Sequence, residues 1–135
     1  MIKRTLSIGR WVVDFLFCEG RYDIDGVVAC LYDSYAPDRV VSQAIELMES
    51  CRYDCGFTYA NELRRRAVVL IGPTSSGDEF IDTLVHEIRH LADSVAHSIG
   101  VKLDSEIPAY ISGDAARALA RTICEMGCTH CRKKG

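Results

Sequence analysis

Apolar residues in the first half of the chain recur first at strand spacing and then at helical spacing. Residues 3–18 are rich in β-branched and aromatic side chains, which predicts a strand or a bent pair of strands. Helical spacing then predicts a short helix that starts near Asp23 and ends before a break at 36–38. The same spacing predicts a second helix over about 38–50.

In the second half of the chain, the spacing predicts a pair of strands followed by two longer helices. Two apolar runs, 57–59 and 67–71, predict a pair of strands joined by the polar turn 61–66. A long amphipathic helix is predicted from Asp78 to the C-cap glycine at position 100, and a last helix from about 104 to 127. Strand, helix, helix, hairpin, helix, helix is an order that predicts an α+β fold.

Composition agrees with one globular domain. Hydrophobic residues make up 48% of the chain and charged residues 26%, a balance typical of ordinary globular proteins. This balance excludes a disordered tail, a collagen-like chain and a coiled-coil rod. The length of 135 residues therefore predicts a single domain spanning 1–135.

Charge and hydropathy narrow the range of partners. The formal net charge is −3, and the basic clusters 64–66 and 132–134 are short and separate, so no nucleic-acid partner is predicted. No apolar run approaches the ~20 residues of a membrane span, so no membrane contact is predicted either. Arg10 and Asp14 interrupt the apolar stretch near the N-terminus, and no small-residue cleavage site follows it. The expected location is cytoplasmic.

An H-E-x-x-H motif in the long helix carries the chemistry. His86 and His90 are one turn apart on one helical face, where two imidazoles can converge on a tetrahedral zinc ion. Glu87 lies beside the first imidazole, where its carboxylate can deprotonate a zinc-activated water and pass the proton to a leaving amine. The motif thus predicts Zn²⁺ as cofactor and Glu87 as general base.

A catalytic zinc usually takes a third protein ligand, and four residues are candidates. His97 is eleven positions beyond His86, about 16 Å along a continuous helix, which is too far. Asp93 could orient a ligand imidazole, and Asp104 is placed to cap the last helix. Glu106 is the preferred ligand, because an antiparallel last helix would bring its first turn near the zinc helix.

Two further features complete the predicted site. Tyr110 lies one turn beyond Glu106, where its phenol is either an oxyanion donor or a half-buried packing group. The strand 67–71 would lie beside the zinc helix, and an edge strand in that place can hold an extended peptide by backbone pairing.

The stretches 83–93 and 104–110 resemble the small zincin-type metallopeptidases of phage and bacterial mobile elements. The resemblance covers about 56–128. It implies a compact zincin-like α+β domain, with a small, mostly antiparallel sheet packed on the H-E-x-x-H helix and a following C-terminal helix. It also implies zinc ligands at His86, His90 and Glu106.

The predicted function is therefore zinc-dependent hydrolysis, with a peptide or protein as substrate. The alternative is a non-catalytic zinc-binding module with a regulatory or interaction role in a mobile element. The carboxylate of Glu87 favours the enzyme, because a structural zinc has no use for it.

The seven cysteines are an odd number, and no export signal accompanies them, so a disulfide framework is not expected. Cys51 and Cys55 form a C-x-x-x-C, while Cys128 and Cys131 form a C-x-x-C. The four are expected either to be reduced thiols, which is the preferred interpretation, or to build a second, structural zinc site. Two other thiols are expected to be small core residues: Cys18 and Cys30.

Overall fold

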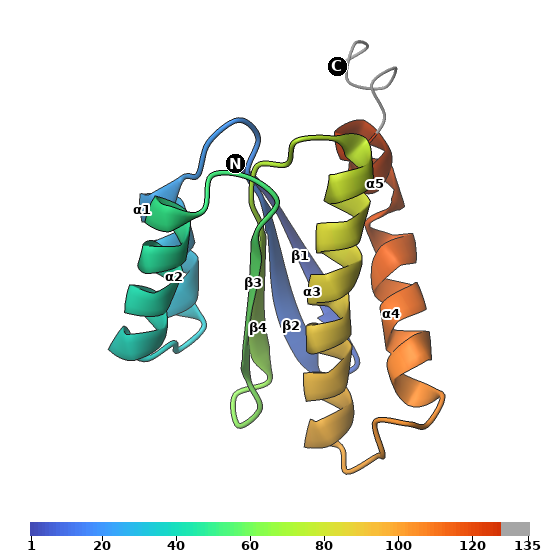
Figure 1. Ribbon diagram of the computed structural model, residues 1–135. Helices are drawn as coiled ribbons and strands as arrows, with labels where there is room; N and C mark the ends of the chain where they lie inside the picture. The colour runs from blue at the N-terminus through green and yellow to red at the C-terminus, as the bar shows by residue number, and fades with distance from the viewer. Residues whose placement is uncertain (128–135) are drawn as a thin grey trace.

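Four strands form one mixed sheet in the order β1-β2-β4-β3 (Figure 1). The structure is a computed structural model, and it describes residues 1–127. Strands β1 (Ile2–Ile8) and β2 (Trp11–Phe17) are antiparallel, as are β3 (Gly56–Asn61) and β4 (Arg66–Ile71), whereas β2 and β4 pair in parallel. All predicted strands are present. Two of its three strand pairs are antiparallel and one is parallel, so the sheet is mixed. The run 67–71 is an inner strand, so the edge strand beside the long helix is β3.

Three helices cover one face of the sheet: α3 (Gly77–Ser98), α4 (Ile107–Ala118) and α5 (Ala120–Gly127). The odd-numbered residues of β2 and β4 point to this face and pack with the apolar stripe of α3. Phe15, Phe17 and Phe80 are fully buried there. The H-E-x-x-H helix therefore has a rigid backing, because its buried side chains interlock with the two central strands.

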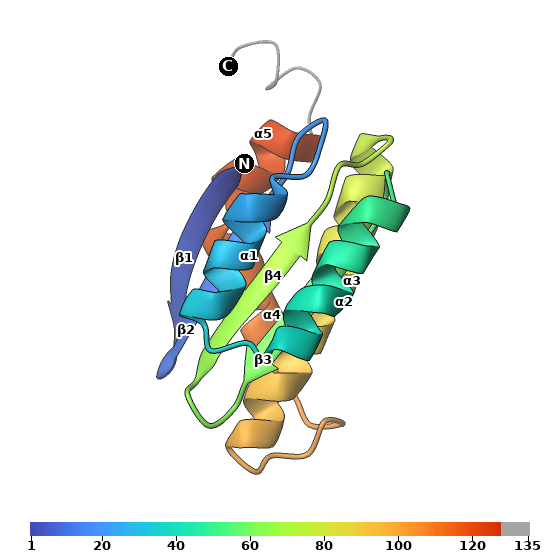
Figure 2. The same cartoon turned by 90° about the vertical axis from the view of Figure 1, so that its left-hand side faces the viewer.

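Two helices cover the opposite face: α1 (Ile24–Asp33) and α2 (Asp38–Ser50) (Figure 2). Even-numbered residues of β2 and β4 form a second core with them, which includes Leu16, Val68 and Leu70. Strands buried on both faces read as continuous apolar runs, which is why the run 67–71 shows no alternation. Among the described residues, no helix is both long and apolar enough to cross a membrane.

The predicted helix boundaries hold except near the C-terminus. The Ser76 side chain caps α3 by accepting a hydrogen bond from the Glu79 N–H at 3.1 Å, and Gly100 follows the helix with a φ of 75°. The single helix expected over 104–127 is wrong. Helix α4 begins at Ile107, and the chain bends at Leu119 before α5 starts.

The bend has a packing cause that local sequence does not signal. Leu119 is buried, and with Ala115 and Met126 it joins the core on the α3 face of the sheet. The bend allows all three side chains to reach that core. The start of α4 differs from expectation as well, because Glu106, not Asp104, occupies the N-cap position, and its side chain makes no capping hydrogen bond.

Candidate metal centre

The two imidazoles of the motif face each other on the exposed side of α3. His86 Nε2 and His90 Nε2 are 3.1 Å apart, and the ring planes meet at 78°. Two ligands at 2.0–2.1 Å from a tetrahedral zinc ion are about 3.3–3.4 Å apart. The separation therefore fits two nitrogens that share one metal ion, and without a metal it suits a hydrogen bond between the rings.

The side chain of Glu87 contacts the edge strand β3, and only 5% of the residue is exposed. The Thr58 hydroxyl donates to Glu87 Oε2 at 2.9 Å and lies 3.3 Å from the Glu87 carbonyl oxygen. At Gly56, a Cβ atom would lie 2.6 Å from Glu87 Cγ. Glycine thus leaves room for the glutamate side chain, and threonine fixes one of its carboxylate oxygens.

Within residues 1–127, the ligand atoms of His86, Glu87 and His90 form a group in which all lie within 4.8 Å of one another. Two imidazole nitrogens and a carboxylate oxygen are a donor set that suits zinc and related divalent transition metals. The predicted motif therefore forms a group of side chains that could hold a metal ion.

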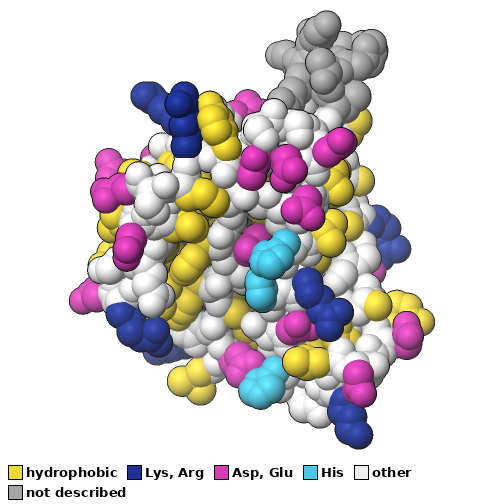
Figure 3. All heavy atoms as spheres, viewed as in Figure 1, with side chains coloured by type: hydrophobic (Ala, Val, Ile, Leu, Met, Phe, Trp, Pro, Cys, Tyr) yellow, Lys and Arg dark blue, Asp and Glu magenta, His cyan; other side chains and the backbone are white. Residues whose placement is uncertain are grey.

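A cleft of about 260 Å³ opens beside this group. Its walls come from the end of α2, the segment before β3, the first residue of β3 and one side of α3. The lining residues are Leu47, Asp54, Cys55, Gly56, Asp82, Thr83, His86 and Glu87. Figure 3 shows histidine side chains (cyan) exposed on this face, with acidic side chains (magenta) near them. A molecule in the cleft would thus touch both the first imidazole and the buried carboxylate.

The other candidates on α3 have different partners. Because α3 is continuous, His97 is far from His86 as predicted, and its Nδ1 pairs with Glu62 Oε1 at 2.7 Å. Asp93 forms an ion pair with Arg89 Nε at 2.8 Å rather than orienting an imidazole.

Glu106 is not part of the group of ligand atoms found among the described residues. Glu106 is exposed at the start of α4, which runs back beside α3 from the far end of that helix (Figure 1). Ser98, at that end, is eight residues beyond His90, about 12 Å along the axis. Tyr110 is 67% exposed. Both assigned roles stay predictions.

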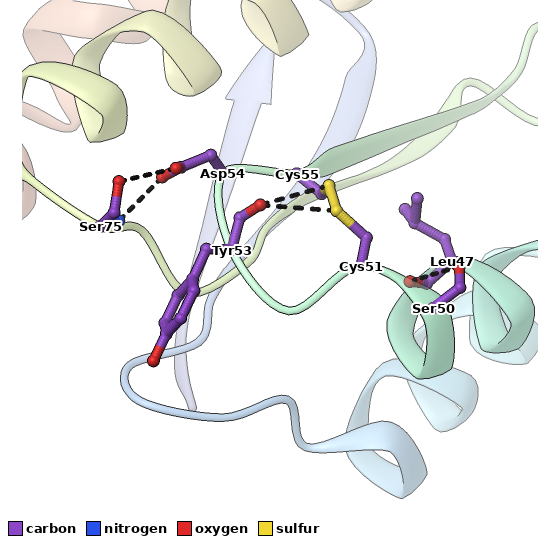
Figure 4. Close-up of a disulfide and its surroundings, with 7 residues drawn as sticks. All are labelled: Leu47, Ser50, Cys51, Tyr53, Asp54, Cys55 and Ser75. Atoms are coloured by element: carbon purple, nitrogen blue, oxygen red, sulfur yellow. Dashed lines mark hydrogen bonds between the residues drawn. A yellow bond between two sulfur atoms is a disulfide. The ribbon is translucent and has the colours of Figure 1, made fainter.

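One pair of cysteines is in a different chemical state from the one predicted. Cys51 and Cys55 form a disulfide in the segment between α2 and β3 (Figure 4), so the prediction of reduced or zinc-bound thiols is wrong for them. Cys128 and Cys131 lie outside the described residues. Cys18 and Cys30 are buried as expected, and burial raises the pKa of both thiols.

Sequence reasoning missed Thr58 and Gly56, the two β3 residues that hold Glu87. Thr58 is 29 positions from Glu87, and no local pattern links the two. A glycine that opens a predicted strand is the one available signal, because such a residue often marks a close approach.

No protein-family model, no curated protein and no solved structure matches the chain. The zincin-like family drawn from the motif therefore stays a prediction.

Proposed function

We propose that this protein is a zinc-dependent metallopeptidase in which His86 and His90 hold the metal and Glu87 is the general base. One observation carries the proposal. Two imidazole nitrogens 3.1 Å apart lie next to a buried carboxylate, and a neighbouring strand holds that carboxylate in place. Glu87 is the residue that a purely structural zinc site would not require.

Each side chain of the group has a distinct task. When bound, zinc polarises a carbonyl group and lowers the pKa of water. Glu87 takes the proton of the attacking water and returns it to the leaving amine. Thr58 holds Oε2 of the carboxylate, so Oε1 is the oxygen that accepts the proton.

The edge strand β3 supports a peptide as substrate. It borders α3, is hydrogen-bonded to the sheet along β4, and contains no charged side chain. An extended peptide can add to such an edge by backbone pairing. A peptide aligned on β3 would pass Gly56 and Thr58, the residues that contact Glu87.

Glu106 is the proposed third ligand, because the family resemblance implies it and because it is the N-cap residue of the helix that runs back beside α3. If it binds zinc, Glu106→Ala should weaken zinc affinity by at least about tenfold and leave the fold intact. Unchanged affinity, together with a collapse in Asp93→Ala or Asp104→Ala, would reassign the ligand.

A second candidate function is a non-catalytic zinc-binding module with a regulatory or interaction role. It is favoured by the small number of ligands that the described residues bring together, two imidazoles and one carboxylate. In that case the hydrogen bond from Thr58 to Glu87 would serve the fold alone.

The variant Glu87→Gln separates the two functions. It keeps the size of the side chain and removes the basic carboxylate, so zinc content should stay at one ion per chain. Hydrolysis of peptides selected from a library should fall by about 10²–10⁴, the usual worth of a general base.

Glu79→Gln is the matched control, because Glu79 is exposed on the same helix and outside the cleft. Retained hydrolysis in Glu87→Gln would remove the proposed mechanism. Zinc loss in that variant would make Glu87 a ligand and favour the non-catalytic module.

A further inference from the structure

We propose that Cys51 and Cys55 are a reversible redox site that sets the width of the cleft beside His86. The disulfide joins Cys51, the C-cap residue that follows α2, to Cys55, the residue that precedes β3. Leu47, one turn before Cys51, and Cys55 itself both line the cleft. The covalent bond therefore fixes the α2 wall of the cleft against the strand that holds Glu87.

The β3 side of this segment is held independently of the disulfide. The Asp54 carboxylate accepts hydrogen bonds from the Ser75 N–H at 2.8 Å and the Ser75 hydroxyl at 2.7 Å (Figure 4). The Asp54 N–H donates to the Pro73 carbonyl at 2.8 Å, and the Gly72 N–H donates to the Cys55 carbonyl at 2.9 Å. Opening the disulfide leaves these four bonds intact, so Cys55 keeps its place.

The α2 side has a different kind of anchor. The Cys51 N–H donates to the Leu47 carbonyl at 2.8 Å, which is a bond within the last turn of α2 and does not tie the helix to the sheet. Met48, next to Leu47, is buried in the second core, so side-chain packing still holds α2 on the sheet when the disulfide is open. Breaking the disulfide removes the covalent tie between the end of α2 and β3, so the last turn of α2, with Leu47, becomes looser against the strand.

The surroundings accommodate both redox states. The Tyr53 carbonyl oxygen lies 3.5 Å from both sulfur atoms. Neither sulfur of the disulfide carries a proton, whereas each thiol of the reduced pair can donate one to this oxygen. Both cysteines are partly exposed, so a small dithiol or the dithiol of an oxidoreductase can reach them.

The exchange balances with a dithiol as the reductant. Its thiolate attacks the sulfur of one cysteine, which forms a mixed disulfide and releases the other cysteine as a thiolate. Its second thiol then attacks the mixed disulfide, closes the ring and releases the first cysteine. The dithiol loses two electrons and two protons and becomes a disulfide. Cys51 and Cys55 gain them and become two thiols, and a disulfide oxidant reverses the step.

Only the wall of the cleft changes in this scheme. His86 and His90 lie on α3, which keeps its packing on the sheet in both states. An effect on hydrolysis rests on the proposed metallopeptidase function, but the loosening of the end of α2 does not.

Hydrogen exchange of the full chain, with and without dithiothreitol, tests the proposal without substrate or metal. Reduction should speed the exchange of amides 47–52 by about tenfold and leave 77–98 unchanged, because only the covalent tie at the end of α2 is lost. Alkylation followed by mass mapping confirms that Cys51 and Cys55 have changed state.

In the double variant C51S/C55S, amides 47–52 should exchange as fast as in the reduced protein, and dithiothreitol should not change the rate. The control variant C124S should behave like the wild type. Equal exchange of 47–52 in the two states would overturn the proposal, and so would thiols at 51 and 55 that never oxidise under a disulfide oxidant. If the double variant does not fold, the comparison of the two wild-type states still decides.

Discussion

On each edge strand of the sheet, a threonine hydroxyl donates a hydrogen bond to a buried carboxylate, but the two carboxylates have different surroundings. On β1, the Thr5 hydroxyl donates to Asp14 Oδ1 at 2.7 Å, and on β3 the Thr58 hydroxyl donates to Glu87 Oε2 at 2.9 Å. Both carboxylates are buried, with 4% of Asp14 and 5% of Glu87 exposed. A buried carboxylate needs partners on either edge, because its desolvation is costly.

The partners differ in kind. Asp14 is the cross-strand neighbour of Thr5, and Lys3 Nζ lies 4.0 Å from its carboxylate. The charged side chains of β1 also protect that edge from pairing with another chain. Glu87 instead adjoins two imidazoles and a cleft, and β3 has no charged residue. Asp14 of β2 thus ties two strands together, whereas Glu87 of α3 faces a place where a reactant fits.

Removing an imidazole should have the largest effect, and it tests directly whether the β3 edge differs from the β1 edge by having a metal site. If the group of side chains beside β3 binds zinc, His86→Ala or His90→Ala should weaken zinc binding by at least about 100-fold, because each variant lacks a direct ligand. Equilibrium dialysis against a zinc chelator measures the affinity.

His97→Ala is the matched control on the same helix. Its side chain pairs with Glu62 and takes no part in the group, so zinc affinity should not change. If all three variants bound zinc as tightly as the wild type, His86 and His90 would not be zinc ligands. The metal site would then no longer distinguish the β3 edge from the β1 edge.

Most of the fold follows from sequence patterns, and the exceptions have tertiary causes. The long helix was predictable because its apolar spacing and Gly100 act locally. The position of 67–71 inside the sheet was not predictable, because apolar spacing predicts which residues form strands but not the order of the strands in the sheet. The bend at Leu119 was not predictable from local sequence either, since no proline or glycine lies at that position.

The site divides in the same way. The pairing of His86 with His90 was predictable, because helical geometry alone places residues i and i+4 together. The burial of Glu87 against Thr58 depends on which strand borders α3, and local sequence does not say. The disulfide of Cys51 with Cys55 was missed because spacing alone does not distinguish a disulfide from a metal pair or two thiols.

Binding of a peptide should sharpen the contrast between the two edges. With Glu87→Gln and a peptide that the wild type cleaves, hydrogen exchange of the β3 amides at 56–61 should slow by about tenfold or more, because backbone pairing closes the edge. The amides of β1 at 2–8 provide the internal control and should not change. Protection of β1 instead, or of neither strand, would contradict docking on β3.

The smallest expected effect comes from the two threonines. Thr58→Val and Thr5→Val each remove one hydroxyl donor, and each should cost about 1–3 kcal/mol of the free energy of unfolding, because a buried carboxylate loses a partner. Urea denaturation followed by circular dichroism measures this loss in both variants.

Only Thr58→Val should also change catalysis. Losing the bond to Oε2 frees the Glu87 carboxylate to rotate, which should lower kcat by about 5- to 10-fold with little change in KM, since proton transfer depends on the orientation of the base. Thr58→Ser keeps the hydroxyl and should restore most of kcat. Thr5→Val should leave both constants unchanged, because Asp14 lies in the β1–β2 ladder. If the two valine variants lost kcat equally, the loss would reflect stability alone, and the bond from Thr58 would be as structural as the one from Thr5.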